Sequence, residues 1–166
     1  MDYKSLVETF GLLPHPEGGF YKEVYRSKEN IPANALPETF LENRSFATGI
    51  YFLLLQNNFS AFHRIKSDEG WHFYEGGSLL VHIIHPDGKY ELLKLGKNFT
   101  KGEVFQGMVP AGCWFASECA ADAAFSFVGC TVSPGFDFAD FELAHQSELV
   151  NFFPQHSAVI ERLCRQ

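Results

Sequence analysis

The chain has 166 residues, of which 46% are hydrophobic, 16% aromatic and 20% charged. This composition predicts a single globular domain over residues 1–166, long enough to bury a core, and excludes a disordered chain. The formal net charge is −7 and the basic residues are interleaved with carboxylates, which excludes a nucleic-acid partner because the overall field would repel a phosphate backbone.

The beginning of the chain predicts a short helix followed by a loop. Leu6, Val7 and Phe10 recur at helical spacing, and Gly11 is a natural helix end. Prolines and paired glycines make residues 12–19 a loop.

From Phe20 the apolar pattern changes to the period of two that is typical of a strand. Residues 28–40 contain two prolines and predict a surface loop. Further strand-like runs then cover residues 46–55, 59–65, 71–74, 79–85, 90–95, 103–109, 113–116 and 123–132. A tight hairpin turn is predicted at residues 86–88, and a helical pattern closes the chain. Many short strands framed by a helix at each end predict an all-β antiparallel sandwich or barrel.

Other features predict a cytoplasmic protein that does not enter a membrane. The longest apolar run, residues 50–55, is far shorter than the about 20 residues of a membrane span. The first residues show no basic segment followed by an apolar run, so we expect no secretory signal. The four cysteines are far apart and form no Cys-x-x-Cys pair, which predicts buried free thiols in a reducing cytosol.

The groups best suited to chemistry are concentrated in residues 60–76. His63, Glu69 and His72 fall within ten positions, and a turn-rich break at residues 66–68 separates two strands. We therefore expect the two histidines to face each other across a hairpin. Imidazoles and a carboxylate in that arrangement suit either a divalent metal or a general base.

These residues resemble the two sequence motifs of cupins. In the first motif His63 takes the place of the first histidine, Glu69 that of the glutamate, and Gly76 lies seven residues beyond Glu69. In the second motif Pro110 and Gly112 occupy the proline and glycine positions.

Two positions depart from the cupin pattern. Ile65 stands where the second histidine of the first motif would be, and Phe115 stands where the last histidine of the second motif would be. Two of the four usual metal-ligand positions are therefore apolar.

Five ordered motifs resemble one small single-domain cupin family more closely. They are Pro14-His15-Pro16-Glu17-Gly18-Gly19-Phe20-Tyr21, Tyr25-Arg26-Ser27, Phe62-His63-Arg64, Ser67-Asp68-Glu69-Gly70-Trp71-His72 and Val109-Pro110-Ala111-Gly112-Cys113-Trp114. The family is predicted to include sugar epimerases, by similarity to the dTDP-keto-sugar epimerases. The resemblance implies a double-stranded β-helix, or jelly-roll barrel, that pairs into a homodimer.

Three residues are candidates for proton transfer. His63 is expected to face the pocket, the alternative being a hydrogen-bonded residue of the barrel wall. His72 and Tyr74 lie two apart on a strand and point the same way, with Trp71 and Phe73 packing the core on the opposite face. A histidine that takes a proton and a tyrosine that gives one would suit an epimerase, which inverts a carbon beside a carbonyl through an enolate.

Four further residues are candidates for ligand binding, each with a structural alternative. Arg26 either clamps a carboxylate or phosphate of the ligand or forms a structural ion pair. Glu17 either lines the pocket mouth or belongs to a tight surface turn with its glycines. Gln106 is either an amide aimed into the barrel or a surface amide. Trp114 either stacks on a sugar or a base or packs in the core.

Three functions remain open on these residues. The first is a metal-independent isomerase or epimerase of a keto-sugar or its nucleotide, with His63 or His72 as base and Tyr74 as acid and no cofactor. The second is a metal-dependent cupin that holds iron, manganese, nickel or zinc through His63, Glu69 and His72, with Gln106 as a further ligand. The third is a module that binds a metabolite without turnover. In each case the partner is a small molecule.

Overall fold

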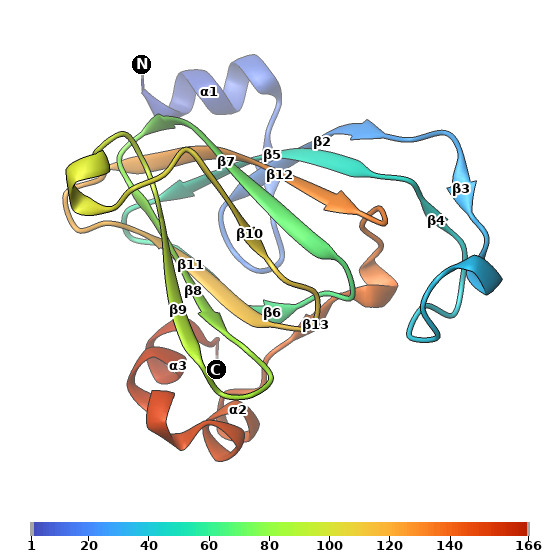
Figure 1. The fold of residues 1–166 in the computed structure, drawn as a ribbon. Helices are drawn as coiled ribbons and strands as arrows, with labels where there is room; N and C mark the ends of the chain where they lie inside the picture. The colour runs from blue at the N-terminus through green and yellow to red at the C-terminus, as the bar shows by residue number, and fades with distance from the viewer. Residues whose placement is uncertain (1, 166) are drawn as a thin grey trace.

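A computed structural model describes residues 2–165 and shows two antiparallel sheets that face each other as a jelly roll, which confirms the predicted all-β fold (Figure 1). The first sheet has the order β1 (Leu13–Pro14), β2 (Phe20–Arg26), β5 (Thr48–Leu55), β12 (Phe125–Ser133), β7 (Asp68–Gly76) and β10 (Gln106–Val109). The second has the order β13 (Glu142–Leu143), β6 (Phe59–Arg64), β11 (Trp114–Cys119), β8 (Leu79–Ile84) and β9 (Tyr90–Leu95).

Short helices lie outside the two sheets. The α-helices are α1 (Tyr3–Phe10), α2 (Gln146–Phe152) and α3 (Ser157–Leu163), and the 3-10 helices are η1 (Ala33–Ala35), η2 (Phe99–Lys101), η3 (Phe138–Asp140) and η4 (Pro154–His156). Helix α1 ends as predicted at Gly11, whose φ of 61° only glycine adopts without strain. Within residues 2–165 no helix is long and apolar enough to cross a membrane.

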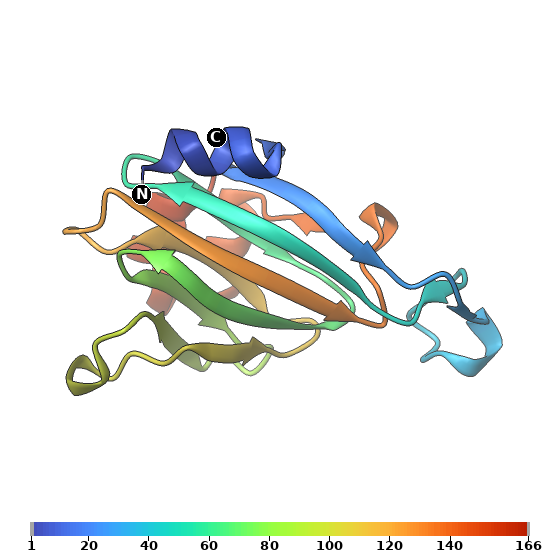
Figure 2. The ribbon, with the colours of Figure 1, turned by 90° about the horizontal axis from the view of Figure 1, so that it is seen from above.

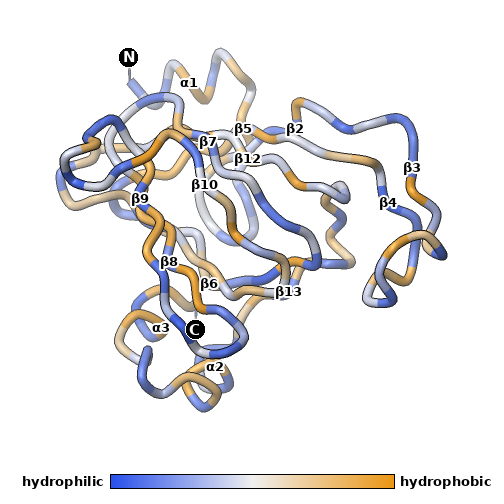
Figure 3. The backbone as a smooth tube through the Cα atoms, viewed as in Figure 1, coloured by the Kyte–Doolittle hydropathy of each residue, from blue (hydrophilic) through white to orange (hydrophobic). Residues whose placement is uncertain are grey.

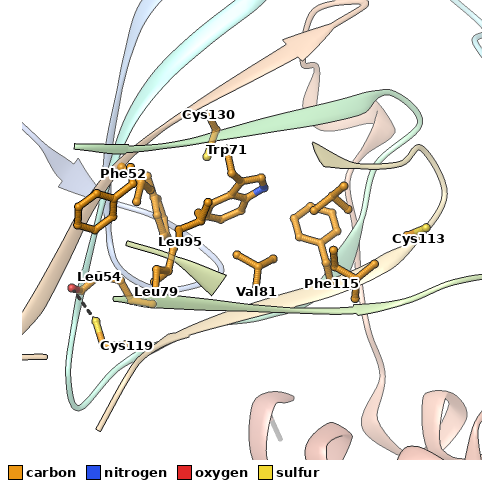
Figure 4. Packing of buried hydrophobic residues seen from close by; sticks show 14 of the residues in the cluster. Phe52, Leu54, Trp71, Leu79, Val81, Leu95, Cys113, Phe115, Cys119 and Cys130 are labelled. Atoms are coloured by element: carbon orange, nitrogen blue, oxygen red, sulfur yellow. Dashed lines mark hydrogen bonds between the residues drawn. The ribbon is translucent and has the colours of Figure 1, made fainter. Parts of the chain in front are cut away.

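The main core fills the space between the sheets. Inward-facing residues of both sheets form it, and Trp71 lies at its centre with its ring 6.0 Å from Phe52 and 6.3 Å from Phe115 (Figure 4). Cys130 packs in the same cluster, and the Cys119 thiol donates to a main-chain oxygen. All four cysteines are free and buried, as predicted.

The helices cover the outer faces of the two sheets with two smaller cores. Helix α1 packs Leu6 against Leu53 and Phe127 on the first sheet (Figure 2). Helices α2 and α3 cover the second sheet, where Ile160 packs with Ile84. Because β8 is thus buried on both faces, its residues are apolar apart from His82, and Figure 3 shows hydrophobic stretches along it.

The segment between β2 and β5 extends away from the jelly roll as an arm, residues 27–47 (Figures 1 and 2). The predicted loop 28–40 lies within this arm and contains one strand of a short hairpin, β3 (Asn30–Ile31) paired with β4 (Arg44–Ser45). Arg44 returns to the body, where its guanidinium makes two hydrogen bonds of 2.7 and 2.8 Å to the carboxylate of Asp140.

Candidate functional site

A small cavity of about 40 Å³ lies between the two sheets. It is lined by His15, Glu17, Ile50, His63, Ile65, Glu69, Val132, Phe136 and Phe141. Its volume is sufficient for about three water molecules, and the polar atoms of His63 and His15 lie 3.0 and 3.6 Å from the carboxyl group of Glu17. Three sequence-predicted residues, Glu17, His63 and Glu69, lie in this cavity.

The loop before β2 carries Glu17 into the interior of the jelly roll. Two glycines permit this path: Gly18 has a φ of 120°, and a side chain there would lie 2.1 Å from the carbonyl oxygen of Phe59. Gly19 has a φ of 76° and approaches the carbonyl oxygen of Leu53 in the same way. Glu17 itself is buried, so the glycines serve a close approach of two segments and not a surface turn.

The main chain of Glu17 is held from two sides. Its carbonyl oxygen accepts from the amide of Ala61 at 3.0 Å and from the guanidinium of Arg165 at 3.1 Å. Arg165 also donates to the carbonyl oxygen of Phe59. The last described residue of the chain therefore clamps the loop that carries Glu17 onto β6.

A β-bulge in β6 sets the position of His63. Phe115 of β11 pairs with His63 and Ser117 pairs with Ser60, so β6 has one residue more than β11 over this interval. The bulge frees the main chain of Ala61, whose carbonyl oxygen lies 2.7 Å from Nδ1 of His63. Because a carbonyl oxygen only accepts, Nδ1 carries the proton, and Nε2 of the neutral ring is left as an acceptor.

Nε2 of His63 lies 3.0 Å from Oε2 of Glu17, and both side chains are buried. Burial raises the pKa of Glu17 to about 7 and lowers the pKa of His63 to about 4. When the pair holds one proton, that proton therefore resides on Glu17, and the protonated carboxyl group donates to Nε2. This agrees with the tautomer that Ala61 selects.

Glu69 adds a second carboxyl group to the cavity. It lies at the start of β7, and burial, reinforced by the nearby charge of Glu17, raises its pKa to about 8. A side-chain hydrogen bond links it to the thiol of Cys130. The cavity thus holds two carboxyl groups that change protonation state near neutral pH.

His15 is a cavity residue that the sequence analysis did not single out. Its Nδ1 accepts from the amide of Glu17 at 3.3 Å, and its ring packs edge-on against Tyr21. Burial lowers the pKa of His15. The available signal was its position two residues before Glu17 in a loop that ends in paired glycines.

Comparison with known proteins places this chain in a family. A family model described as the cupin superfamily (DUF985) matches residues 4–144. The chain belongs to this family of cupins. The uncharacterized protein YML079W of Saccharomyces cerevisiae is 31% identical over 146 residues, which are 82% of this chain and 72% of the yeast protein.

Solved structures show the same cupin fold. A hypothetical protein from Leishmania major superposes with a TM-score of 0.92 and 36% identity over the whole of both chains. Protein SO0799 from Shewanella oneidensis superposes with a TM-score of 0.89 and 40% identity, covering 99% of this chain and 98% of its own. Oxalate decarboxylase of Bacillus subtilis has 16% identity and a TM-score of 0.54 over 90% of this chain and 36% of its own, a similarity of fold alone.

The cupin does not bring His72 and Tyr74 into the cavity. Side chains alternate along β7, so Glu69 points inward with Trp71, whereas His72 and Tyr74 point to the outer face of the first sheet. His72 makes a 2.9 Å hydrogen bond to Thr131 there, and Tyr74 is 46% exposed. The expected convergence of His63 and His72 is therefore corrected: the two rings lie on opposite sides of the sheet wall. Trp71 and Phe73 pack in the core, as predicted.

The other ligand-binding candidates also lie outside the cavity. Gln106 is exposed and pairs with His72 across the outer face. Arg26 forms an ion pair of 2.7 Å with Glu23, the structural alternative stated above. Trp114 lies on the outer face of the second sheet, where the guanidinium of Arg64 stacks 4.6 Å from its ring.

The residues present do not fit the metal site that the cupin motifs imply. The positions of two ligands are taken by Ile65 and by Phe115, whose ring packs 4.1 Å from that of His63. His72 points away, and Nε2 of His63 faces Glu17. Among the residues that the structure describes, no group of three or more His, Cys, Asp or Glu is arranged to hold a metal.

Proposed function

We propose that this cupin binds a small carbonyl compound and moves a proton on the carbon next to the carbonyl group, as an isomerase or epimerase that works by acid–base chemistry. The observation that carries this proposal is the pair of buried carboxyl groups, Glu17 and Glu69, beside His63 in one cavity. Their pKa values of about 7 and about 8 match the requirement that a general acid and base titrate near the working pH.

The chemistry balances with these groups alone. One carboxylate takes the proton from the carbon, and the electron pair of that C–H bond moves to the carbonyl oxygen as an enolate. The other carboxyl group, still protonated, donates a hydrogen bond to the enolate and then gives its proton to the carbon from the opposite face. The electron pair of the enolate returns to the carbon as the new C–H bond forms, which restores the carbonyl group and inverts the centre, and the two carboxyl groups regain their starting protonation states by exchange with water. His63 accepts from Glu17 and holds that carboxyl group in position.

A keto-sugar is one candidate for the substrate, since it has an acidic C–H beside a carbonyl. The cavity of about 40 Å³ admits no nucleotide, so only the carbonyl end of a sugar nucleotide would reach Glu17 and Glu69. The remainder would lie in the larger pocket next to the cavity, which has a volume of about 480 Å³, within the usual range for ligand pockets.

The test is solvent deuterium exchange. The protein is incubated in D₂O with a panel of keto-sugars, keto acids and simple ketones, and loss of the C–H signal is followed by proton NMR. We expect exchange with the wild type and a loss of about 10²-fold or more in His63→Ala and Glu69→Gln. The matched control is His72→Ala, which removes an imidazole from the outer face and leaves the rate unchanged.

Two results would overturn the proposal. One is an absence of exchange over the whole panel, which would leave a metabolite-binding module if binding were still measured. The other is exchange that continues at the wild-type rate in both cavity variants, since the chemistry would then lie elsewhere.

A further inference from the structure

A vestibule of about 480 Å³ lies beside the cavity and opens to solvent. Four separate segments build it: the arm, the end of β6, the turn between β10 and β11, and the segment from η3 to β13. Its lining consists of Pro37, Thr39, Phe40, Arg64, Ile65, Lys66, Ala111, Gly112, Asp140 and Glu142. Of the described residues, Ile65 alone lines both the vestibule and the cavity of Glu17.

The cations and carboxylates that line the vestibule are paired. Asp140 is already paired with Arg44 through two hydrogen bonds of 2.7 and 2.8 Å, and Lys66 approaches the same carboxylate at 3.3 Å. Arg64 pairs with Glu142 at 2.7 Å. Of the residues that line the vestibule, Arg64 and Lys66 are cations and Asp140 and Glu142 are carboxylates, and the buried Arg44 adds a second cation to Asp140.

Lys66 is the cation whose hydrogen-bond donors are best placed to bind a ligand. An ammonium group has three N–H donors, and in the part of the chain that the structure describes its recorded ion-pair partner is Asp140 alone. The guanidinium of Arg44 binds both oxygens of that carboxylate, so Lys66 shares its anionic partner with a second cation. Its side chain is 32% exposed and is open to a ligand.

The walls of the vestibule distinguish the two ends of a ligand. Lys66 supplies a charged group, whereas Ile65 and Phe40 supply apolar surface, and Ile65 also lines the cavity. A molecule with one negative group and a short carbon skeleton satisfies both: the anion binds the ammonium group, and the rest follows Ile65 toward Glu17 and Glu69.

We propose that the vestibule binds a single carboxylate or phosphate group of the substrate through Lys66, so that the substrate class is a small monoanionic keto compound. The part of this inference that concerns the reacting end of the substrate rests on the proposed function. The anion site itself is inferred from the residues that line the vestibule. Lys66 is a specificity-determining residue in this scheme, and Ile65 forms the wall along which the reacting end passes.

The experiment uses the full chain labelled with ¹⁵N. Pyruvate and inorganic phosphate are titrated separately at constant ionic strength, because added salt alone screens surface charge, and the amide signals of residues 64–66 and 111–112 are followed. We expect saturable shifts with at least one probe, and the probe that saturates identifies the anion as carboxylate or phosphate. Lys66→Met should weaken that binding at least tenfold. The control Lys89→Met removes an exposed lysine of the β8–β9 turn and should bind as the wild type does.

The anion site is overturned if neither probe gives saturable shifts at these amides, or if Lys66→Met binds as tightly as the wild type. The deuterium-exchange assay separates this failure from failure of the proposed function. Exchange restricted to neutral ketones and unaffected by Lys66→Met would keep the proton transfer and overturn the substrate class. Saturable anion binding without exchange on any keto compound would keep the vestibule site and overturn the proton transfer.

Discussion

Replacing Glu69 by glutamine should make the protein more stable near neutral pH, although the residue is buried and lies in the candidate site. The reason is that burial raises the pKa of this carboxyl group from 4.5 to about 8. The unfolded chain releases the proton above pH 4.5, whereas the folded protein retains it. Release of the proton stabilises the unfolded state but not the folded one, so the free energy of unfolding decreases. A glutamine is neutral at every pH and has no such effect.

The sign and size follow from proton linkage. Between the two pKa values the folded state binds one proton more than the unfolded state, so stability falls as pH rises, by about 1.4 kcal/mol per pH unit for one group. The contribution is fully present below pH 4.5 and is lost as pH passes through about 8. At pH 7 the wild type has lost about 3 kcal/mol by this route, from a shift of the pKa of Glu69 to about 8.

Urea unfolding, followed by tryptophan fluorescence at pH 5, 6, 7 and 8, measures how the free energy of unfolding depends on pH. Glu69→Gln should be close to the wild type at pH 5, exceed it by about 3 kcal/mol at pH 7, and show a shallower dependence on pH. Glu161→Gln, at an exposed site on α3, is the control and should track the wild type. A Glu69→Gln variant with the same pH slope as the wild type would refute the buried, protonated state of Glu69.

Three further outcomes are expected. Gly18→Ala should lower the free energy of unfolding in urea by at least about 3 kcal/mol, since the added carbon would lie 2.1 Å from the carbonyl oxygen of Phe59. Gly102→Ala, also at positive φ but in open space, is the control and should lower it by only about 1 kcal/mol. Equal losses in the two variants would contradict the close approach at Gly18. Arg165→Met should speed amide hydrogen exchange in the Glu17 loop by roughly tenfold, because a charge-assisted clamp is lost; unchanged protection would show that the clamp is dispensable. We also expect light scattering to give a molar mass twice that of one chain, as for a homodimer. A molar mass equal to that of one chain would contradict this prediction.

Much of the architecture could be predicted from local pattern. The period of two and the positions of glycine and proline located the main strands to within about three residues, and Gly11 ended helix α1 as expected. The candidate site was harder, because it depends on which face of each strand is inside. Glu69 and His72 differ by an odd number of positions, so one strand through both must point them to opposite faces. The apolar run that starts at Trp71 predicted the beginning of the strand there, whereas β7 begins at Asp68.

The sequence by itself determined that His63 and Glu69 belong to a cupin pocket and that two ligand positions of the usual metal site are apolar, because those facts are residue identities at fixed spacings. Only the tertiary structure decided between the two predicted roles of Glu17, a residue of the pocket or of a surface turn, because it buries Glu17 beside His63 and Glu69. Its place depends on Gly18 passing within van der Waals distance of β6, a segment about 40 residues further along the chain. No local periodicity encodes such an approach, since the forces that bury a loop act between segments that are neighbours only after folding.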